Sequence, residues 1–475
     1  MKKAIAFIAA VILTVSVFGV FSGAVSESDF SDPKFTLLMQ CASGVNYTDD
    51  DILLEGKYCM RGFTVSPDGK HLFGGILNPN GAGAVVRFDT ETGHAGAYWY
   101  YEQTEGEKVG TRSYPKGLDC DDRGYLYVGL AYNPNAVRAY LAVVKTDEIK
   151  DDLMKTESVV PVLVDENNSK VGVNGVAVKA IGGKYYCYVV INYNEDYLYR
   201  FDVTTPEAPA LDTSFGIGGR IDLQKISTAS SGDVTEGNYL DIDDDGTIYI
   251  AYTAQNGAGL LKLSEDGNSV LGEVSQATGY AVAVVEDYVL CASQKAGSEI
   301  VVYDKQTLDK KASMTITENN IVLPYDEKYN LAFVDPINSI VGMRYHGGVL
   351  YLGDQGSGTS DQEQIFAIGL TDEGKATVKA AAAVLEGVAK ALKDNVTTAA
   401  ATTEAVTTAP AVTETTSPAT DDTSAPAEST ASGTAAPEVT TASSSAEKKG
   451  CGSFAALSVI PAAVLGCAFI RRRED

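Results

Sequence analysis

The sequence predicts an all-β protein: a six-bladed β-propeller with four antiparallel strands per blade, followed by a short helix, a disordered stalk and a transmembrane helix. Two observations lead to the propeller. Residues 29–370 consist of short β-branched and aromatic runs separated by Gly, Asp and Asn. Hairpin-type turns also recur at intervals of 41 to 63 residues, at Gly69, Gly124, Gly183, Gly246, Asp287 and Gly348. Repeats of about 50 residues, each forming a small sheet, are typical of propellers.

The first unit shows the pattern most clearly. Strands are predicted at Gly62–Val65 and His71–Ile76, on either side of a Pro-Asp-Gly turn, and then at Ala84–Asp89 and Ala97–Tyr100. Five later units repeat this order, with first strands at 117–120, 175–178, 239–242, 281–284 and 341–344. A β-sandwich is the alternative, but sandwich strands do not recur in units of four.

A propeller also has to close its ring. We expect Phe35–Met39, near the start of the globular part, to complete the last blade as its outer strand. Such closure covers a strand edge that could otherwise pair with another chain. The propeller is therefore predicted to occupy residues 27–371.

The N-terminus has the layout of a secretory signal peptide over residues 1–26. Two lysines precede an apolar run from Ala4 to Phe21, and Ala24, Val25 and Ser26 are small enough for cleavage before Glu27. An uncleaved membrane anchor is the alternative, although the run is short. The sequence therefore predicts export.

Three segments follow the propeller. Residues 395–449 are rich in Thr, Ala, Ser, Pro and Glu and are expected to form a disordered stalk. Residues 450–475 combine an apolar run with three arginines, which predicts a C-terminal membrane anchor whose end is cytoplasmic. Residues 372–394 are expected to form an amphipathic helix that docks on the propeller. Its apolar side chains recur at steps of three and four, at Val378, Ala381, Leu385, Val388 and Leu392.

The tail resembles the C-terminal anchoring signals of surface proteins from Gram-positive gut bacteria of the clostridial type. The shared features are the stalk, the short motif Cys451-Gly452, the apolar segment and the arginine cluster. Because the tail has no LPxTG sortase motif, membrane retention or processing near Cys451 is favoured over covalent attachment to the wall. The propeller is expected to be displayed at the cell surface.

Charge restricts the partners. The chain has 37 Lys+Arg and 63 Asp+Glu, a formal net charge of −26, which argues against nucleic acid because its phosphates would be repelled. Only three histidines are present, so a His-rich metal centre is excluded. We expect a monomer that contacts the membrane through its C-terminal helix and binds an extracellular carbohydrate or protein.

The middle of the chain resembles the broad superfamily of six-bladed propellers with NHL, YVTN or SMP-30-type repeats. The resemblance lies in the order of apolar strand, Asp/Gly turn and Tyr/Leu/Val strand, as in Gly117–Cys120, Gly124 and Tyr125–Val128. It extends over residues 29–370. It implies the fold and says little about function.

The first strand of each blade lines the central channel, so polar residues just before these strands are expected to converge on one mouth. These candidate ligand-binding residues are Arg61, Lys116, Asn174, Glu236, Asn238 and Tyr280, with Ser339 in the last unit. Convergent polar groups from separate blades are the default ligand site. Two cations beside amides and a tyrosine suit an anionic or sugar-like ligand. The alternative is a water-filled channel whose polar groups satisfy one another.

The predicted function is binding of a carbohydrate, a peptide or a surface protein at this mouth, with no catalytic residue, metal ligand or cofactor assigned. The alternative is an extracellular metal-dependent hydrolase, lactonase or glycoside-active, because SMP-30-like hydrolases carry acidic and Asn metal ligands at the matching mouth. Only Asn174, Glu236 and Asn238 are of a suitable type, and Arg61 stands at the first-blade position. Binding is therefore preferred to catalysis.

Three local patterns have two interpretations each. The run Asp241–Gly246 matches the opening of a calcium loop, but Tyr252 stands where that loop needs Glu, so a plain hairpin is preferred and Ca²⁺ is the one cofactor left open. The run Tyr98–Tyr101 suits either sugar stacking or an outer strand with buried rings. The cysteines are expected to be small buried residues, with a Cys41–Cys59 disulfide as the alternative.

Overall fold

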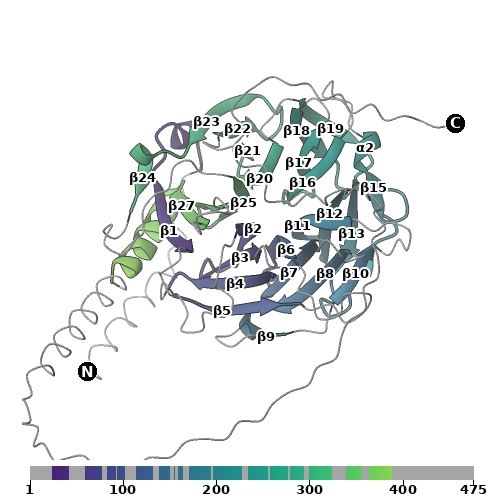
Figure 1. Ribbon diagram of the computed structural model, residues 1–475. Helices are drawn as coiled ribbons and strands as arrows, with labels where there is room; N and C mark the ends of the chain where they lie inside the picture. Colours follow the sequence, from purple (N-terminus) through teal and green to yellow (C-terminus); the bar gives the residue numbers. More distant parts are fainter. Residues whose placement is uncertain are drawn as a thin grey trace, which may run out of the picture. The chain divides into compact units, whose positions relative to one another are not determined.

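Six antiparallel sheets surround a common centre, which confirms the predicted six-bladed propeller (Figure 1). The computed structural model describes residues 24–41, 59–77, 83–91, 94–101, 114–131, 139–149, 154–155, 159–163, 171–193, 196–226, 234–254, 257–275, 279–293, 299–323, 339–355 and 363–387. They belong to one unit, residues 1–391, whereas a second unit, residues 392–475, lies outside the described residues. The predicted stalk, the membrane anchor and the signal peptide up to residue 23 also lie outside them. Within the described ranges, no helix is both long and apolar enough to cross a membrane.

The inner strands of the first three blades follow one another along the chain, and β9 returns to blade 1 after the first three strands of blade 2. Blade 1 contains β2 (Cys59–Val65), β3 (His71–Leu77), β4 (Gly83–Asp89), β5 (His94–Tyr100) and β9 (Met154–Lys155). Blade 2 contains β6 (Tyr114–Cys120), β7 (Tyr125–Ala131), β8 (Ala139–Lys145) and β10 (Val159–Leu163). Blade 3 contains β11 (Val171–Ile181), β12 (Lys184–Tyr193), β13 (Tyr197–Asp202), β14 (Ala210–Leu211) and β15 (Arg220–Asp222).

The next three blades complete the ring. Blade 4 contains β16 (Val234–Ile242), β17 (Ile248–Ala254), β18 (Gly257–Leu263) and β19 (Val270–Ser275). Blade 5 contains β20 (Gly279–Val285), β21 (Tyr288–Ser293), β22 (Glu299–Asp304) and β23 (Lys310–Thr315). Blade 6 contains β25 (Ile340–His346), β26 (Val349–Asp354), β27 (Glu363–Gly369), β1 (Phe35–Cys41) and β24 (Ile321–Val322). Short helices lie between strands at η1 (Glu27–Phe30), η3 (Thr146–Glu148), α2 (Leu223–Ile226) and η4 (Glu318–Asn320).

The prediction of four strands per blade is confirmed for blades 2, 4 and 5, whereas blades 1, 3 and 6 contain five strands each. In blades 1 and 6 a two-residue strand, β9 or β24, runs parallel to the outer strand. In blade 3 the outer position is divided between β14 and β15, which pair with opposite ends of β13. Short parallel additions of this kind cover an otherwise open strand edge, and no periodic pattern in the sequence marks them.

The turns between the first and second strands occur where the sequence predicts them. Gly69, Gly124 and Gly246 have φ angles of 69°, 84° and 86°, a region that glycine enters without steric cost. Blade 5 is the exception, because its turn uses Glu286 at a φ of 52°. The repeat therefore fixes the position of the turn more strictly than the residue that forms it.

The predicted closure of the ring is confirmed. Strand β1 pairs antiparallel with β27, with Thr36 opposite Ala367 and Leu37 opposite Phe366. The side chains of Phe35 and Leu37 are fully buried in a cluster that also contains Phe366. The first described strand thus completes the last blade, and apolar packing holds the two ends of the propeller together.

A helix over residues 372–387 follows blade 6. Its first turn is capped, because Thr371 Oγ1 accepts a hydrogen bond of 3.0 Å from the N–H of Gly374. Val378 and Leu385 are buried in the same core cluster as residues of the propeller, and Ala381 packs against it. The helix therefore docks on the propeller with its expected apolar face. Val388 and Leu392 lie outside the described residues.

The aromatic run and the cysteines contribute to the core. Trp99, Tyr100 and Tyr101 are buried, so these three rings pack inside the propeller and the sugar-stacking interpretation is wrong for them. Cys187 and Cys291 are buried free thiols. The Cys41–Cys59 disulfide falls outside what the structure describes, since the side chains of both residues lie outside it.

A buried arginine joins three blades at the centre. Arg344, on β25, donates from Nε to Asp119 Oδ1 at 3.1 Å and from Nη2 to the carbonyl oxygens of Leu118 and Val176, both at 3.0 Å. Its side chain is 9% exposed. Blade 6 is thereby linked to blades 2 and 3 across the propeller.

Two buried carboxylates extend this central network. Asp119 also accepts a hydrogen bond from the N–H of Val178, and Asp241 accepts one from the N–H of Val284, both at 2.8 Å. Burial raises the pKa of Asp241, and the positive charge of Arg344 opposes that shift. The carboxyl group of Asp241 therefore depends on the charge of Arg344 to remain ionised inside the protein.

Replacing Arg344 with methionine should lower the free energy of unfolding by about 3–5 kcal/mol, because Asp119 and Asp241 would stay buried without their cation. Urea unfolding at pH 7 measures the loss. The matched control is Lys184→Met, which removes an ion pair whose lysine side chain is 57% exposed and should cost less than about 1 kcal/mol. Equal stability of the two variants would contradict the role given to Arg344.

Candidate functional site

Each inner strand contains a β-bulge close to its start, where the register of the strand ladder shifts by one residue or more. Five of the residues at these shifts are predicted candidates, namely Arg61, Lys116, Asn174, Asn238 and Tyr280. A bulge redirects the side chain of its extra residue, and bulges are common beside functional sites. The same irregularity recurs at the equivalent place in all six inner strands.

Two details of the prediction need correction. Arg61, Lys116, Asn174, Glu236, Asn238 and Tyr280 lie within the inner strands and not just before them, because each strand begins one to four residues earlier. In blade 6 the bulge residue is Val341, whereas Ser339 precedes β25 and donates its N–H to Asp354 Oδ1 at 3.0 Å. Blade 6 therefore contributes an apolar side chain to the mouth.

Glycines beside the bulges let the inner strands approach one another. A Cβ atom on Gly62 would lie 1.9 Å from the carbonyl oxygen of Lys116, and one on Gly175 would lie 2.6 Å from that of Asn238. Distances this short exclude any side chain at these positions. The pairs Arg61-Gly62, Lys116-Gly117 and Asn174-Gly175 therefore combine a directed polar side chain with a close backbone contact.

Hydrogen bonds connect the polar side chains of blades 2, 3 and 4 in series. The ammonium group of Lys116 donates to Asn174 Oδ1. Asn174 Nδ2 then donates to Glu236 Oε1 at 3.1 Å and to the carbonyl oxygen of Gly237 at 2.8 Å. Asn192, at the end of β12, donates from Nδ2 to the same oxygen of Glu236. Lys116, Asn174, Asn192 and Glu236 form what we call the mouth network.

The side chain of Asn238, two residues after Glu236, is held by hydrogen bonds to blades 4 and 5. Its Nδ2 donates to Thr253 Oγ1 at 3.1 Å and to the carbonyl oxygen of Gly279 at 2.9 Å, so blade 4 is tied to blade 5. The side chain is 1% exposed. Because both donor hydrogens are used, the orientation of the amide is fixed and its oxygen points away from these partners.

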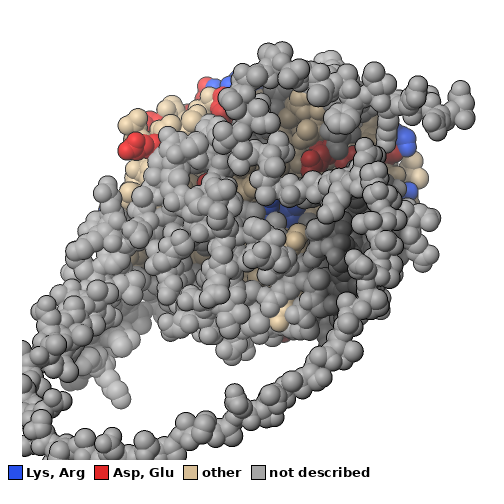
Figure 2. All heavy atoms as spheres, in the orientation of Figure 1, with Lys and Arg blue, Asp and Glu red and all other residues tan. Residues whose placement is uncertain are grey.

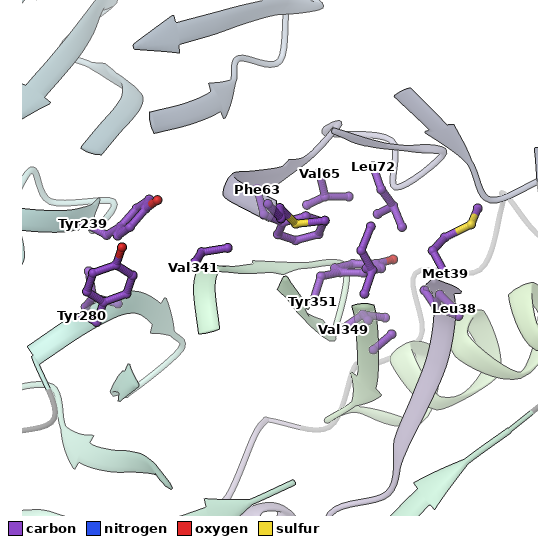
Figure 3. Packing of buried hydrophobic residues seen from close by; sticks show 14 of the residues in the cluster. Leu38, Met39, Phe63, Val65, Leu72, Tyr239, Tyr280, Val341, Val349 and Tyr351 are labelled. Atoms are coloured by element: carbon purple, nitrogen blue, oxygen red, sulfur yellow. The ribbon is translucent and has the colours of Figure 1, made fainter. Parts of the chain in front are cut away.

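Below the mouth, two tyrosines fill the channel. The hydroxyl group of Tyr239 donates to the carbonyl oxygens of Arg61 and Lys116, and so reaches from blade 4 to blades 1 and 2. Its ring lies edge-on to that of Tyr280, with centroids 5.5 Å apart, and Figure 3 shows both rings beside Val341. These two rings and the side chain of Arg344 are buried where the inner strands meet.

Two functional candidates are missing from the sequence-based prediction. Asn192 completes the mouth network, and Asp196 lies beside it, accepting a 2.8 Å hydrogen bond from Gln224 Nε2. Asn192 lies at the end of the second strand of blade 3, and Asp196 follows that strand. Because the second strand of a blade ends where the first begins, polar residues at its end face the same mouth, and that rule would have found Asn192.

Burial changes the protonation of two of these groups. It lowers the pKa of the Lys116 ammonium to about 8, with Glu236 opposing the shift and Arg61 adding to it. It also raises the pKa of Asp196 to about 6, against hydrogen bonds from Gln224 and the N–H of Gly237. The site therefore contains a lysine and a carboxyl group that are both poised near neutral pH.

The calcium interpretation of Asp241–Gly246 is not supported by the positions of its carboxylates. The segment forms a hairpin turn, in which the N–H of Asp243 donates to the carbonyl oxygen of Thr247 at 2.9 Å. Asp243 pairs with Lys305 and Asp244 with Lys179, at 2.9 and 2.6 Å. Among the described residues, no group of three or more His, Cys, Asp or Glu side chains could hold a metal ion.

In Figure 2, a blue area of Lys or Arg atoms and a red area of Asp or Glu atoms are visible near the middle of the view. In the mouth network, Lys116 and Glu236 are joined through one amide, that of Asn174.

No family model matches the sequence, and no curated protein matches it. Solved structures show a likeness in fold. A structure of U3-55K is similar at 9% identity over 70% of this chain and 98% of its own, with a TM-score of 0.40. A protein of unknown function from Bacteroides thetaiotaomicron is similar at 12% identity over 70% and 76%, with a TM-score of 0.42. BamB from Moraxella catarrhalis is similar at 11% identity over 65% and 82%, with a TM-score of 0.32. At such identities the likeness says nothing about function.

The Asp196 carboxyl group should give the protein a specific pH dependence. Its folded-state pKa of about 6 lies above the unfolded value of 3.8, so it contributes stability at low pH that is lost as the pH rises from about 4 through 6. The variant Asp196→Asn has no carboxyl group at this position, so its stability does not change with the ionisation of residue 196. Relative to the variant, the parent protein should become less stable by about 2–3 kcal/mol between pH 4 and pH 7.

Urea unfolding of both proteins across this pH range measures the difference. Asp372→Asn is the control, because the Asp372 side chain is 99% exposed and its removal should leave the pH dependence unchanged. A constant difference between the parent and Asp196→Asn at all pH values would contradict the raised pKa.

Proposed function

We propose that this protein is a binding module displayed outside the cell, and that its ligand, a carbohydrate, a peptide or a surface protein, binds at the channel mouth. The observation that carries the proposal is the mouth network, a hydrogen-bonded series from Lys116 to Asn192 that crosses three blades. Strands from separate blades hold these side chains, with Lys116 and Asn174 on bulges, and such rigid convergence of polar groups is what a binding site requires.

A hydrolase fits the same residues less well. Glu236 is the carboxylate at the mouth, and it is engaged by the amides of Asn174 and Asn192. The nearby Asp196 is 1% exposed and bonded to Gln224, so it supports the site from below. A pair of carboxyl groups that both reach a substrate, as glycoside hydrolysis requires, is not formed by these described residues.

Display through the C-terminus is compatible with an accessible mouth. The helix over residues 372–387 begins at the turn of Gly348, whose carbonyl oxygen accepts a 2.8 Å hydrogen bond from the N–H of Leu370. This turn joins β25 to β26 at the opposite end of β25 from the mouth. The chain therefore leaves the last blade on the face away from the site, which supports attachment through the C-terminal segment.

Binding at the mouth predicts that the site variants lose affinity while the fold is kept. Lys116→Met and Asn174→Ala should each weaken binding of the ligand by about tenfold or more, since each removes a charge-assisted or amide contact. The full chain, purified in detergent, is screened on arrays of glycans, peptides and surface proteins. Thermal melting of each variant reports on the fold.

The matched control is Lys184→Met, an exposed lysine at the start of β12 on the opposite face, which should bind as the parent does. Equal binding by all three variants would contradict the mouth as the binding site. Turnover of an ester or glycoside that is lost in Glu236→Gln would replace the binding proposal with the hydrolase.

Export with removal of a signal peptide is part of the proposal, but the structure argues for a cleavage point upstream of Glu27. Val25 is 5% exposed and packs in the cluster of Phe30 and Phe35. The N–H and the hydroxyl group of Ser26 donate to Asp29 Oδ2 at 2.9 and 2.8 Å, which holds Ser26 against the first turn of η1. Cleavage before Glu27 would remove both residues from the folded domain.

We expect the exported chain to begin at Val25, with Ser22 and Ala24 as the small residues that the peptidase reads. N-terminal sequencing of the exported protein tests this directly. A first residue of Glu27 would contradict it and would leave the space of Val25 unfilled.

A further inference from the structure

The side chains of Lys116 and Asn174 meet where the inner strands of blades 2 and 3 come together. The ammonium group of Lys116 donates to Asn174 Oδ1, although the two residues are 58 positions apart in the chain. Lys116 is 9% exposed and Asn174 is fully buried. Because a C=O bond is about 1.2 Å long, an amine in hydrogen-bond contact with Oδ1 also lies within about 4 Å of Cγ. A nitrogen nucleophile and an acyl carbon are thus held together away from water.

The backbone keeps the two side chains in this contact. Each residue lies at a bulge and is followed by a glycine. A Cβ atom on Gly117 would lie 2.7 Å from the backbone nitrogen of Val176, so the two strands are as close as their backbones permit. Groups that are held in this way react without losing further translational freedom, which strongly accelerates intramolecular reactions.

The amide of Asn174 presents its carbonyl group to the lysine. Its Nδ2 donates to Glu236 Oε1 at 3.1 Å and to the carbonyl oxygen of Gly237 at 2.8 Å, so both amide hydrogens are used on the side of blade 4. The carbonyl oxygen therefore faces Lys116, and the amide nitrogen faces a carboxyl group. Glu236 is half-buried, so a molecule released at this nitrogen would leave beside a group that reaches solvent.

Burial also keeps part of Lys116 in the reactive form. It lowers the pKa of the ammonium group to about 8, while the charge of Glu236 opposes this shift and that of Arg61 adds to it. At pH 8 about half of the Lys116 side chains are therefore free amines, the form that attacks a carbonyl carbon. Since Lys116 touches Asn174 Oδ1, the positive charge of Arg61 also lies near the oxygen on which negative charge develops.

We propose that Lys116 and Asn174 form an intramolecular amide cross-link between blades 2 and 3, an inference that does not depend on the proposed binding function. The free amine of Lys116 attacks Cγ of Asn174. Glu236 takes the proton that the attacking nitrogen loses and passes it to Nδ2, the Cγ–Nδ2 bond breaks, and ammonia leaves. One C–N bond replaces another, so no oxidant, reductant or co-reactant is needed. The hydrogen-bonded pair is the state before this reaction.

The cross-link would tie two blades together without dismantling the mouth network. Glu236 keeps Asn192 as a donor, and the ammonium group of Lys116 becomes the N–H of a neutral amide. The segment from residue 116 to residue 174 becomes a closed loop, which removes conformational freedom from the unfolded chain and so stabilises the folded one.

Peptide mass spectrometry of the full chain, purified in detergent and kept folded at pH 8, tests the proposal. Trypsin cuts after a free lysine but not after an acylated one, so the cross-link joins peptide 113–123 to peptide 171–179. We expect a branched peptide whose mass is the sum of the two less about 17 Da, the mass of one ammonia. Peptides 113–116 and 117–123 with no branched peptide would overturn the cross-link. This measurement depends on no variant.

Lys116→Arg and Asn174→Ala should each abolish the branched peptide, because each removes one of the two reacting groups. Glu236→Gln should slow its formation about a hundredfold, since an amide cannot carry the proton. The matched control is Lys184→Arg, at a lysine whose side chain is 57% exposed, which should form the cross-link as the parent does. Melting temperatures show whether each variant is folded. Formation at the parent rate in Glu236→Gln would overturn the role given to Glu236.

A second route to the same loss of mass is separated by these measurements. Ring closure by the backbone nitrogen of Gly175 on the side chain of Asn174 would also release ammonia. That product loses about 17 Da within peptide 171–179 and persists in Lys116→Arg, and its presence without the branched peptide would overturn the cross-link. No ligand enters these measurements, so absence of the cross-link overturns this inference alone and leaves the binding proposal to its own test.

Discussion

Close approach of the inner strands around one centre is the constraint on which the structure depends. Gly62 and Gly175 leave no room for a Cβ atom, because the backbone of the next blade fills that space. The residue before each glycine cannot stay in the ladder at this distance and becomes a bulge, with its side chain turned to the mouth. The same close approach of the inner strands therefore both packs the ring and positions the bulge residues.

The axis of the propeller is polar along much of its length. Arg344, with Asp119 and Asp241, lies at one level, and the mouth network lies at another, with the rings of Tyr239 and Tyr280 near the mouth. Each charge is matched by a partner from another blade, because an unmatched charge in this position would cost several kcal/mol. The same interactions that fix the order of the blades also leave the mouth with defined donors and acceptors.

The repeat allowed much of this structure to be predicted from the sequence. Turns at Gly69, Gly124 and Gly246, closure by Phe35–Met39 and the docking of Val378 follow from local patterns of two, three and four residues. The sequence analysis did not predict Asn192 and Val341 as part of the site, because their roles depend on contacts between strands. Asn192 acts through Glu236 in the next blade, and Val341 is identified by its bulge. Neither relation leaves a periodic trace in the chain.

The sequence by itself determined the all-β repeat, the number of blades and five of the residues that the bulges turn to the mouth, since each depends on residue types at regular spacing. Tertiary structure alone decided that Tyr239 and Arg344 lie where the blades meet, and that Asp243 and Asp244 pair with lysines of the neighbouring blades. It also decided that the amide oxygens of Asn192 and Asn238 accept no hydrogen bond from the described residues. These features arise from contacts between blades, where residues far apart in the chain meet at distances that no local pattern encodes.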